Sequence, residues 1–352
     1  MKRLALLLMV LVVVGCANRH DPAISGFYEI QHATTQDGVR IALHHYNAAE
    51  GAVSTDRPVV VCHGICSNRY SFLSNPHGGL LGALVEQGRD VWAIELRGHG
   101  RSDRPGKTDG MKFDWDLDDY ALQDLPAAVD FVMSRTDADG VDYIGHSMGG
   151  MVAYIALSRG ELEQVRSLVI VASPVSLHQS SKWIGGLFEL ESLLRRMKKL
   201  PVRSGAKLGT ILPADHDFVV KTLYNPENTT RAESRQLLLN GVNDLGLVEA
   251  EQWLQMKKRG YLTDAGGELN YVEMMGAITV PALVLAGSVD ETAMPHQVRM
   301  GYEALGSPDK EYYVVGRANG AGSDYGHMDL VNGSNADTDV YPVIIRWLDA
   351  HR

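Results

Sequence analysis

Short apolar runs alternate along the chain with segments whose apolar residues recur at helical spacing. The runs predict strands at Val59–Cys62, Val91–Leu96, Val141–Ile144, Leu168–Val171, Leu283–Ala286 and Tyr312–Val315. The spacing predicts helices at Leu80–Gln87, Leu117–Ser134, Met148–Leu157 and Pro295–Leu305, and a last helix from Val340. Continuous apolar runs are typical of strands buried on both faces, and strand–helix alternation favours right-handed crossovers. We therefore expect an α/β fold with a mostly parallel central sheet flanked by helices.

Two segments depart from this alternation. Residues Phe27 to Thr35 and Val39 to Tyr46 flank an Asp37-Gly38 turn and predict a β-hairpin. Between residues 175 and 276 the strand pattern stops, and Trp183 and Phe188 precede the basic run Arg195, Arg196, Lys198 and Lys199. We expect residues 26–174 and 277–352 to form the core. Residues 175–276 would form a helical cap whose Trp183/Phe188 face lines an acyl pocket, or simply one more packed helical layer.

The N-terminus has the features of a targeting segment. Lys2 and Arg3 precede eleven apolar residues, too few to span a ~30 Å hydrocarbon core as a helix. Residues 1–15 therefore read as a signal peptide and residues 16–25 as a tether. The run from Val13 to Cys16 resembles the bacterial lipobox, which implies lipidation at Cys16; the alternative is ordinary cleavage near Ala17. The resemblance implies a lipid-anchored envelope protein, with the outer membrane favoured because Ala17 is not aspartate, and a mature domain in the periplasm or at the cell surface.

Composition excludes several classes of protein. The chain of 352 residues carries 33 Lys and Arg against 43 Asp and Glu, a net charge of −10. Lys and Arg form no block of the kind that follows a phosphate backbone, so we expect no nucleic-acid partner. Three cysteines cannot build a disulfide framework, and no Cys/His pattern has zinc spacing, so no metal site is expected. The sequence does not indicate an oligomeric state.

The first chemical motif is Gly145-His146-Ser147-Met148-Gly149-Gly150. It follows a predicted strand and opens a predicted helix, the context of a nucleophile elbow. Such a turn leaves the Ser147 hydroxyl at a helix N-terminus, where developing negative charge is favoured. The second motif is the loop Cys62-His63-Gly64-Ile65, which follows the strand before the first helix. We expect the Ile65 and Met148 amides to form an oxyanion hole. His63 is an alternative base, and Cys66 would line the site or merely pack.

The third region lies after residue 280. The strand Leu283–Ala286 leads to Asp290, and His327 stands in a Gly-flanked turn after the last strand. A serine nucleophile needs an imidazole base, and the imidazole needs a carboxylate that fixes its tautomer. We therefore predict that Ser147, His327 and Asp290 act together, with Glu291, Asp324 and Asp329 as alternative acids.

In this order the motifs resemble the α/β-hydrolase superfamily over residues 26–352 apart from the insertion. The shared segments are His63-Gly64, Arg97 to Ser102, Gly145 to Gly150 and Gly287 to Asp290. His63-Gly64-Ile65 and His327 to Leu330 are similar to the acid-lipase and monoacylglycerol-lipase branches. Ser147 in the nucleophile position argues against branches that use a carboxylate nucleophile, and the Arg97–Ser102 loop is expected to be structural.

The resemblance implies a carboxylic ester hydrolase with no cofactor and with a small-molecule or lipid ester as substrate. The same triad also serves lactonases, thioesterases, C–C hydrolases and acyltransferases. A different class, a lipoprotein that uses the fold only to bind a ligand or partner, remains the remote alternative.

Overall fold

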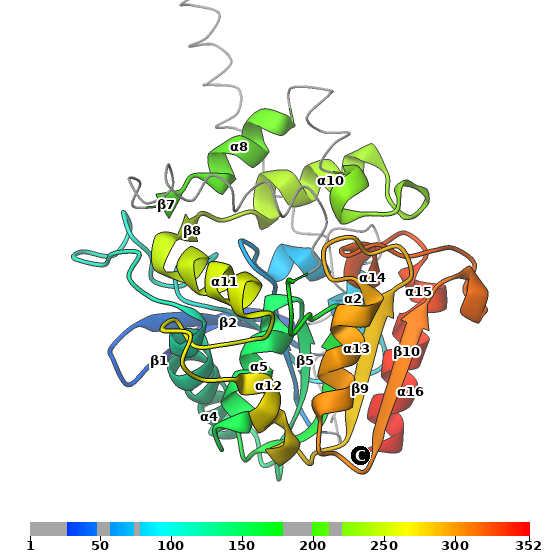
Figure 1. Cartoon of the computed structure of the whole chain (residues 1–352), viewed down its shortest axis with the longest axis horizontal. Coiled ribbons are helices and arrows are strands. Elements are labelled where there is room, and N and C mark those ends of the chain that lie inside the picture. Colours follow the sequence, from blue (N-terminus) through cyan, green and yellow to red (C-terminus); the bar gives the residue numbers. More distant parts are fainter. Residues whose placement is uncertain (1–26, 48–56, 74–77, 179–198, 211–219) are drawn as a thin grey trace, which may run out of the picture.

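An eight-stranded sheet runs through the computed structural model, which describes residues 27–47, 57–73, 78–178, 199–210 and 220–352 (Figure 1). The strand order is β1-β2-β4-β3-β5-β6-β9-β10. The strands are β1 Phe27–Thr34, β2 Arg40–Asn47, β3 Val59–Cys62, β4 Val91–Glu95, β5 Val141–His146, β6 Val165–Val171, β9 Ala282–Gly287 and β10 Lys310–Val315. β1 and β2 are antiparallel to their neighbours, and all other pairs are parallel. The expected mostly parallel sheet is confirmed.

Helices cover both faces of this sheet (Figure 1). The core helices are α2 Gly79–Glu86, α3 Leu117–Asp119, α4 Leu125–Met133, α5 Met148–Ser158, α12 Tyr271–Met274, α13 Pro295–Ala304, α14 Asp329–Asn332, α15 Ala336–Asp339 and α16 Tyr341–Ala350. Contacts separate them into two groups. α5, α12 and α13 pack together with the 3-10 turn η5 Met275–Ala277, while α2 contacts α14, α15 and α16. The sheet is therefore buried between two helical layers.

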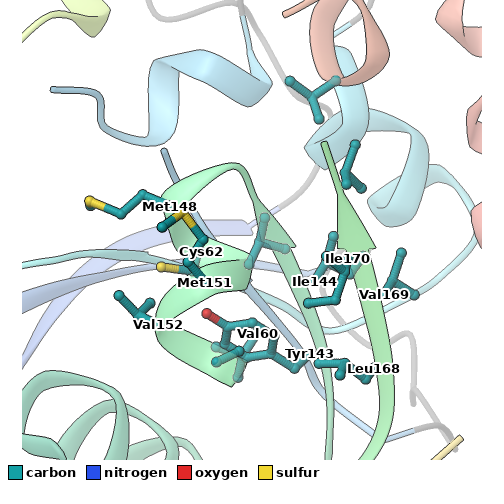
Figure 2. Packing of buried hydrophobic residues seen from close by; sticks show 14 of the residues in the cluster. Val60, Cys62, Tyr143, Ile144, Met148, Met151, Val152, Leu168, Val169 and Ile170 are labelled. Carbon is teal, nitrogen blue, oxygen red and sulfur yellow. The ribbon is translucent and has the colours of Figure 1, made fainter. Parts of the chain in front are cut away.

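The sequence pattern accounts for the central strands. Every residue of β3, β4, β5 and β9 is buried, as expected of apolar runs that pack helices on both faces. In the hairpin, Gly38 adopts a φ of +86°, which permits the tight turn predicted at Asp37-Gly38. Figure 2 shows Met148, Met151 and Val152 of α5 beside the strands that carry Cys62 and Tyr143. This packing fixes α5 against the carboxyl ends of β3 and β5.

The predicted helix Leu117–Ser134 is interrupted. A π-helical turn, η2 Tyr120–Asp124, separates α3 from α4, and the Leu125 N–H donates to the Tyr120 carbonyl five residues earlier. Pro126 at the start of α4 has no N–H, which removes a hydrogen bond that an unbroken α-helix would need. The proline therefore explains the wider turn.

The described parts of residues 175–276 do not pack as a single layer. The described elements are the 3-10 turn η3 Pro226–Asn228, helices α8 Val202–Gly209, α10 Arg231–Gln236 and α11 Leu247–Arg259, and the π turn η4 Leu237–Gly241. A two-stranded antiparallel sheet joins β7 Lys199–Leu200 to β8 Leu245–Gly246, where the sequence indicated no strand. These elements lie beyond one end of the sheet, whereas α12 packs on α5 (Figure 1).

Several expectations fall outside the described residues. These are the signal peptide 1–15, Cys16 with the tether 16–25, and the Trp183/Phe188 face. Within the described ranges, no helix is long and apolar enough to cross a bilayer. In the same ranges, no group of three or more His, Cys, Asp and Glu side chains is arranged to hold a metal ion.

Candidate active site

Ser147 lies on a strained turn between β5 and α5. Its φ of +54° and ψ of −121° belong to a region that a non-glycine residue occupies at a cost of about 1–3 kcal/mol. Its backbone N–H donates to the Val171 carbonyl of β6 (2.8 Å), and its carbonyl accepts from Gly150 and Met151. Ser147 is 4% exposed. Hydrogen bonds to strand and helix thus hold the turn and place the serine at the N-terminus of α5.

The glycines of this motif are required by close backbone approach. A Cβ on Gly149 would lie 2.3 Å from the Cys62 carbonyl oxygen, and one on Gly145 would lie 2.6 Å from the Gly149 oxygen. A Cβ on Gly150 would lie 2.2 Å from Ser173 Oγ. The small residues therefore let α5 cross close to the ends of β3 and β5, as the elbow interpretation predicted.

Gly149→Ala is expected to destabilise the protein by about 1–3 kcal/mol, because the new methyl group meets backbone rather than a flexible side chain. Urea denaturation followed by circular dichroism measures the change. Gly276→Ala is the matched control, since no atom lies within 4 Å of its added Cβ. Equal denaturation midpoints for the two variants would contradict the close-approach argument.

His327 and Asp290 are brought together from separate loops. His327 Nδ1 lies 2.8 Å from Asp290 Oδ2, and both residues are buried. The other carboxylate oxygen of Asp290 accepts the backbone N–H groups of Thr292 (2.7 Å) and Ala293 (2.8 Å). These hydrogen bonds from backbone amides fix the Asp290 carboxylate. The carboxylate in turn holds the His327 ring with Nε2 directed away from Asp290.

The other candidate acids are engaged elsewhere. Asp324 Oδ1 accepts from Ser288 Oγ (2.9 Å) and from the Arg317 N–H (3.1 Å). Asp329 Oδ2 accepts from Asn228 Nδ2 (2.8 Å) and the Gly326 N–H (3.0 Å), and burial raises its pKa to about 6. Glu291 is exposed. Of the four carboxylates considered, Asp290 is the one bonded to the His327 ring.

His63, the alternative base, has a hydrogen-bond partner at each ring nitrogen. The Leu96 N–H donates to His63 Nε2 (3.2 Å), so Nδ1 carries the proton that is donated to the Gly64 carbonyl (2.8 Å). Burial lowers the pKa of His63, which keeps the imidazole neutral. His63 therefore organises the loop after β3 rather than accepting a proton from Ser147.

The two predicted oxyanion donors belong to segments that lie next to Ser147. Met148 is the first residue of α5, so its N–H has no acceptor within the helix. Ile65 follows Gly64, and a Cβ on Gly64 would lie 3.0 Å from Ser147 Cβ. The loop after β3 thus passes directly beside the serine. Next to Ile65, burial raises the pKa of the Cys66 thiol well above its usual value, which disfavours the thiolate.

The Arg97–Ser102 loop is structural. The Arg97 guanidinium bonds Asp124 (2.8 Å) and both carboxylate oxygens of Asp37 (2.7 and 3.0 Å). The Ser102 hydroxyl accepts the Ala42 N–H and donates to the Glu95 carbonyl. Arg97 and Ser102 therefore tie the turn after β4 to the hairpin, as expected.

His146 holds the loop that carries His327. His146 Nε2 lies 3.1 Å from the His327 carbonyl oxygen, and the two ring centroids are 4.8 Å apart. Burial, and then the neighbouring His327, lower the pKa of His146 well below its usual value, so the ring stays neutral. A neutral ring bonded to a carbonyl must donate from Nε2. The sequence placed His146 only in the turn motif, and its position before Ser147 was the available signal.

The insertion, residues 175–276, also forms hydrogen bonds with the loop that carries His327. The sequence did not indicate these contacts. Asn228 Nδ2 donates to the Asp324 carbonyl (2.7 Å) and to Asp329, and the Met328 N–H donates to the Leu223 carbonyl (2.8 Å). The Asn225 side chain donates to the same Asp324 carbonyl. Residues 223–228 therefore form hydrogen bonds with residues that precede His327 and with residues that follow it.

Comparisons with known proteins identify the family to which this fold belongs. Residues 57–319 match the family described as alpha/beta hydrolase fold. Human lipase member M is 29% identical over 91% of this chain and 82% of its own length, and human lipase member K is 27% identical over 60% of this chain. The chain spans 51% of lipase member K and 34% of human gastric triacylglycerol lipase.

Solved structures show the same fold at low identity. One described as a membrane phospholipase A, a novel bacterial virulence factor, has a TM-score of 0.61 at 16% identity, with 100% of this chain and 99% of that chain covered. A thermophilic esterase from Thermogutta terrifontis has a TM-score of 0.60 at 17% identity, covering 92% of this chain and 100% of its own. The expected fold class is confirmed.

Proposed function

The chain belongs to the α/β-hydrolase family, and on that premise we propose that it is a serine hydrolase that cleaves carboxylic esters. The observation that carries the proposal is the buried Asp290–His327 pair, because the His327 carbonyl accepts a hydrogen bond from His146, the residue before Ser147 on the strained turn. Lipases among the relatives and esterases among the similar structures favour an ester as the scissile group.

In the proposed mechanism Ser147 Oγ attacks the acyl carbonyl carbon while His327 Nε2 takes the hydroxyl proton. Asp290 holds the Nδ1–H tautomer and stabilises the imidazolium that forms. The Ile65 and Met148 amides donate to the tetrahedral oxyanion. Collapse breaks the ester C–O bond, and the alcohol leaves with the proton from His327. Water then attacks the acyl-enzyme by the same steps and releases the acid.

We propose that the described parts of 175–276 other than α12 and η5 act as a cap over this site. The Asn243 N–H donates to the Cys66 carbonyl (2.8 Å), and the Asn68 side chain donates to the Asn240 carbonyl (3.0 Å). Together with the bonds of Leu223 and Asn228, these contacts reach loops after β3 and β10. Ligands of open α/β sheets bind at this carboxyl edge, so the contacts support a cap.

Hydrolysis of p-nitrophenyl esters from C2 to C16 tests the function. We expect turnover that disappears in Ser147→Ala, with a chain-length optimum that measures the acyl pocket. Hydrolysis that is unchanged in Ser147→Ala would overturn the proposal. No turnover by a protein whose Ser147 still reacts with a fluorophosphonate would redirect it to a lactone, thioester or C–C substrate.

We also propose that the chain is a lipoprotein anchored through Cys16, on the strength of the Val13–Cys16 run after a basic and apolar leader. Cys16→Ser is expected to move the protein from the membrane fraction to the soluble fraction of a bacterial host, because the lipid attachment atom is lost. Fractionation followed by immunoblotting measures this, with Cys66→Ser as the control. Unchanged partitioning of Cys16→Ser would contradict the anchor.

A further inference from the structure

Positive charge is concentrated in one short stretch of an otherwise acidic chain. Residues 192–214 contain six Lys and Arg and no Asp or Glu, which leaves 27 Lys and Arg against 43 Asp and Glu in the rest of the sequence. The six are Arg195, Arg196, Lys198, Lys199, Arg203 and Lys207. The proposed hydrolytic function uses none of these six side chains. It therefore does not account for the concentration of positive charge in this stretch.

The described part of the stretch lies on the outside of the proposed cap. α8 contacts η4, and η4 contacts the 3-10 turn η1 Arg69–Phe72, which follows the loop after β3. Figure 1 shows α8 as an outer element on the side away from the C-terminus. η4 and η1 therefore lie between α8 and β4, and Ser147 follows the carboxyl end of β5 in the same sheet.

The surface of α8 is both cationic and apolar. Val202 and Ala206 share one face at helical spacing, and Arg203 and Lys207 share the next. Leu208 follows Lys207 with 56% of its surface exposed. Among the described residues, no carboxylate pairs with the Arg203 guanidinium, since Asp244 accepts only the Arg203 backbone N–H and pairs with Lys199. The helix is thus suited to a surface that supplies negative charge and accepts an apolar side chain.

Asp244 fixes the beginning of this helix to the rest of the cap. Its carboxylate pairs with the Lys199 ammonium and accepts the Arg203 N–H (3.2 Å). The Lys199 ammonium also lies 5.6 Å from the centre of the Phe113 ring. α8 is therefore held in place at its N-terminal end and presents its side chains from a defined position.

We propose that α8 docks this protein onto a membrane surface rich in anionic phospholipid headgroups. Lys and Arg side chains at a membrane surface are attracted to acidic headgroups, and an exposed leucine enters the boundary between headgroups and acyl chains. An acidic protein surface would meet the cations but would leave Leu208 without a comparable apolar environment. Docking through α8 turns the edge of the sheet that carries Ser147 toward the lipid. This orientation does not require that the substrate of the proposed function be a lipid ester.

Vesicle co-sedimentation of the full chain tests the inference, with phosphatidylcholine vesicles compared with vesicles that also contain phosphatidylglycerol. All variants carry Cys16→Ser so that no lipid anchor contributes, and the N-terminus is otherwise identical in each. We expect Arg203→Glu/Lys207→Glu to weaken binding to the anionic vesicles on the order of tenfold or more. Arg346→Glu/Arg352→Glu makes the same charge change on exposed residues at the C-terminal end and is expected to bind like the parent.

Leu208→Ser provides a second variant, which keeps the charge and removes the apolar contact. We expect it to weaken binding while the preference for phosphatidylglycerol remains. Hydrolysis of a soluble short-chain ester, unchanged in the α8 variants, separates loss of docking from loss of fold. Equal binding to both vesicle types, or equal losses in the α8 and C-terminal variants, would overturn the proposal. No binding to either vesicle would also overturn it and would leave an acidic protein as the occupant.

Discussion

Ser147→Ala is expected to lower kcat for ester hydrolysis by a factor on the order of 10³ to 10⁶. The substitution removes the oxygen that forms the acyl-enzyme, and the loss is large because serine, histidine and aspartate act as one unit. The amides of Ile65 and Met148 and the binding pocket remain, so a residual rate above that in water is expected. Steady-state kinetics on the preferred p-nitrophenyl ester measures the factor.

The matched control for this prediction is Ser158→Ala. Ser158 ends the same helix and is also buried, but its hydroxyl donates to the Ile155 carbonyl within the helix (2.9 Å). We expect kcat of the Ser158 variant to stay near that of the parent. Equal activity of the two variants would remove Ser147 from the mechanism.

Asp290→Asn has the second largest expected effect, a loss in kcat on the order of 10⁴. An amide nitrogen in place of Oδ2 would donate toward His327 Nδ1 and impose the wrong tautomer on the ring. An amide also gives the imidazolium no countercharge. The neighbouring amides of Thr292 and Ala293 favour an oxygen at the other position, which keeps the nitrogen turned toward the histidine.

Glu291→Gln is the control for this second prediction, because Glu291 is adjacent but exposed. Asp324→Asn tests the remaining rival, whose carboxylate bonds Ser288 and Arg317. We expect a large loss in kcat for Asp290→Asn alone. A loss of similar size for Asp324→Asn, with Asp290→Asn close to the parent, would reassign the acid.

The strands were predictable because burial on both faces requires an apolar residue at nearly every position. β3 and β9 are such runs, and the structure extends the predicted β9 strand by one residue at each end, to Ala282 and Gly287. The elbow was predictable for a related reason, since strand and helix can cross closely only where Gly145, Gly149 and Gly150 omit a side chain. These local requirements leave a local signature in the sequence.

The hydrogen bonds between residues 223–228 and the loop that carries His327 left no such signature in the sequence. Asn228 reaches Asp329 across 101 positions of sequence, from a segment whose composition has no regular period. A polar side chain that satisfies a distant loop resembles any surface asparagine until the fold brings the two segments together. The interruption of the predicted helix Leu117–Ser134 was partly predictable. Pro126 was visible in the sequence, although the predicted helix ran through it.

Covalent labelling of the protein by a fluorophosphonate tests the central claim most directly, because only an activated serine reacts rapidly with this probe. Peptide mass spectrometry then locates the modified residue. We predict one modified peptide, carrying the probe on Ser147, and loss of labelling in both Ser147→Ala and His327→Ala. Absence of labelling in a folded protein, or labelling that persists in Ser147→Ala, would contradict the account.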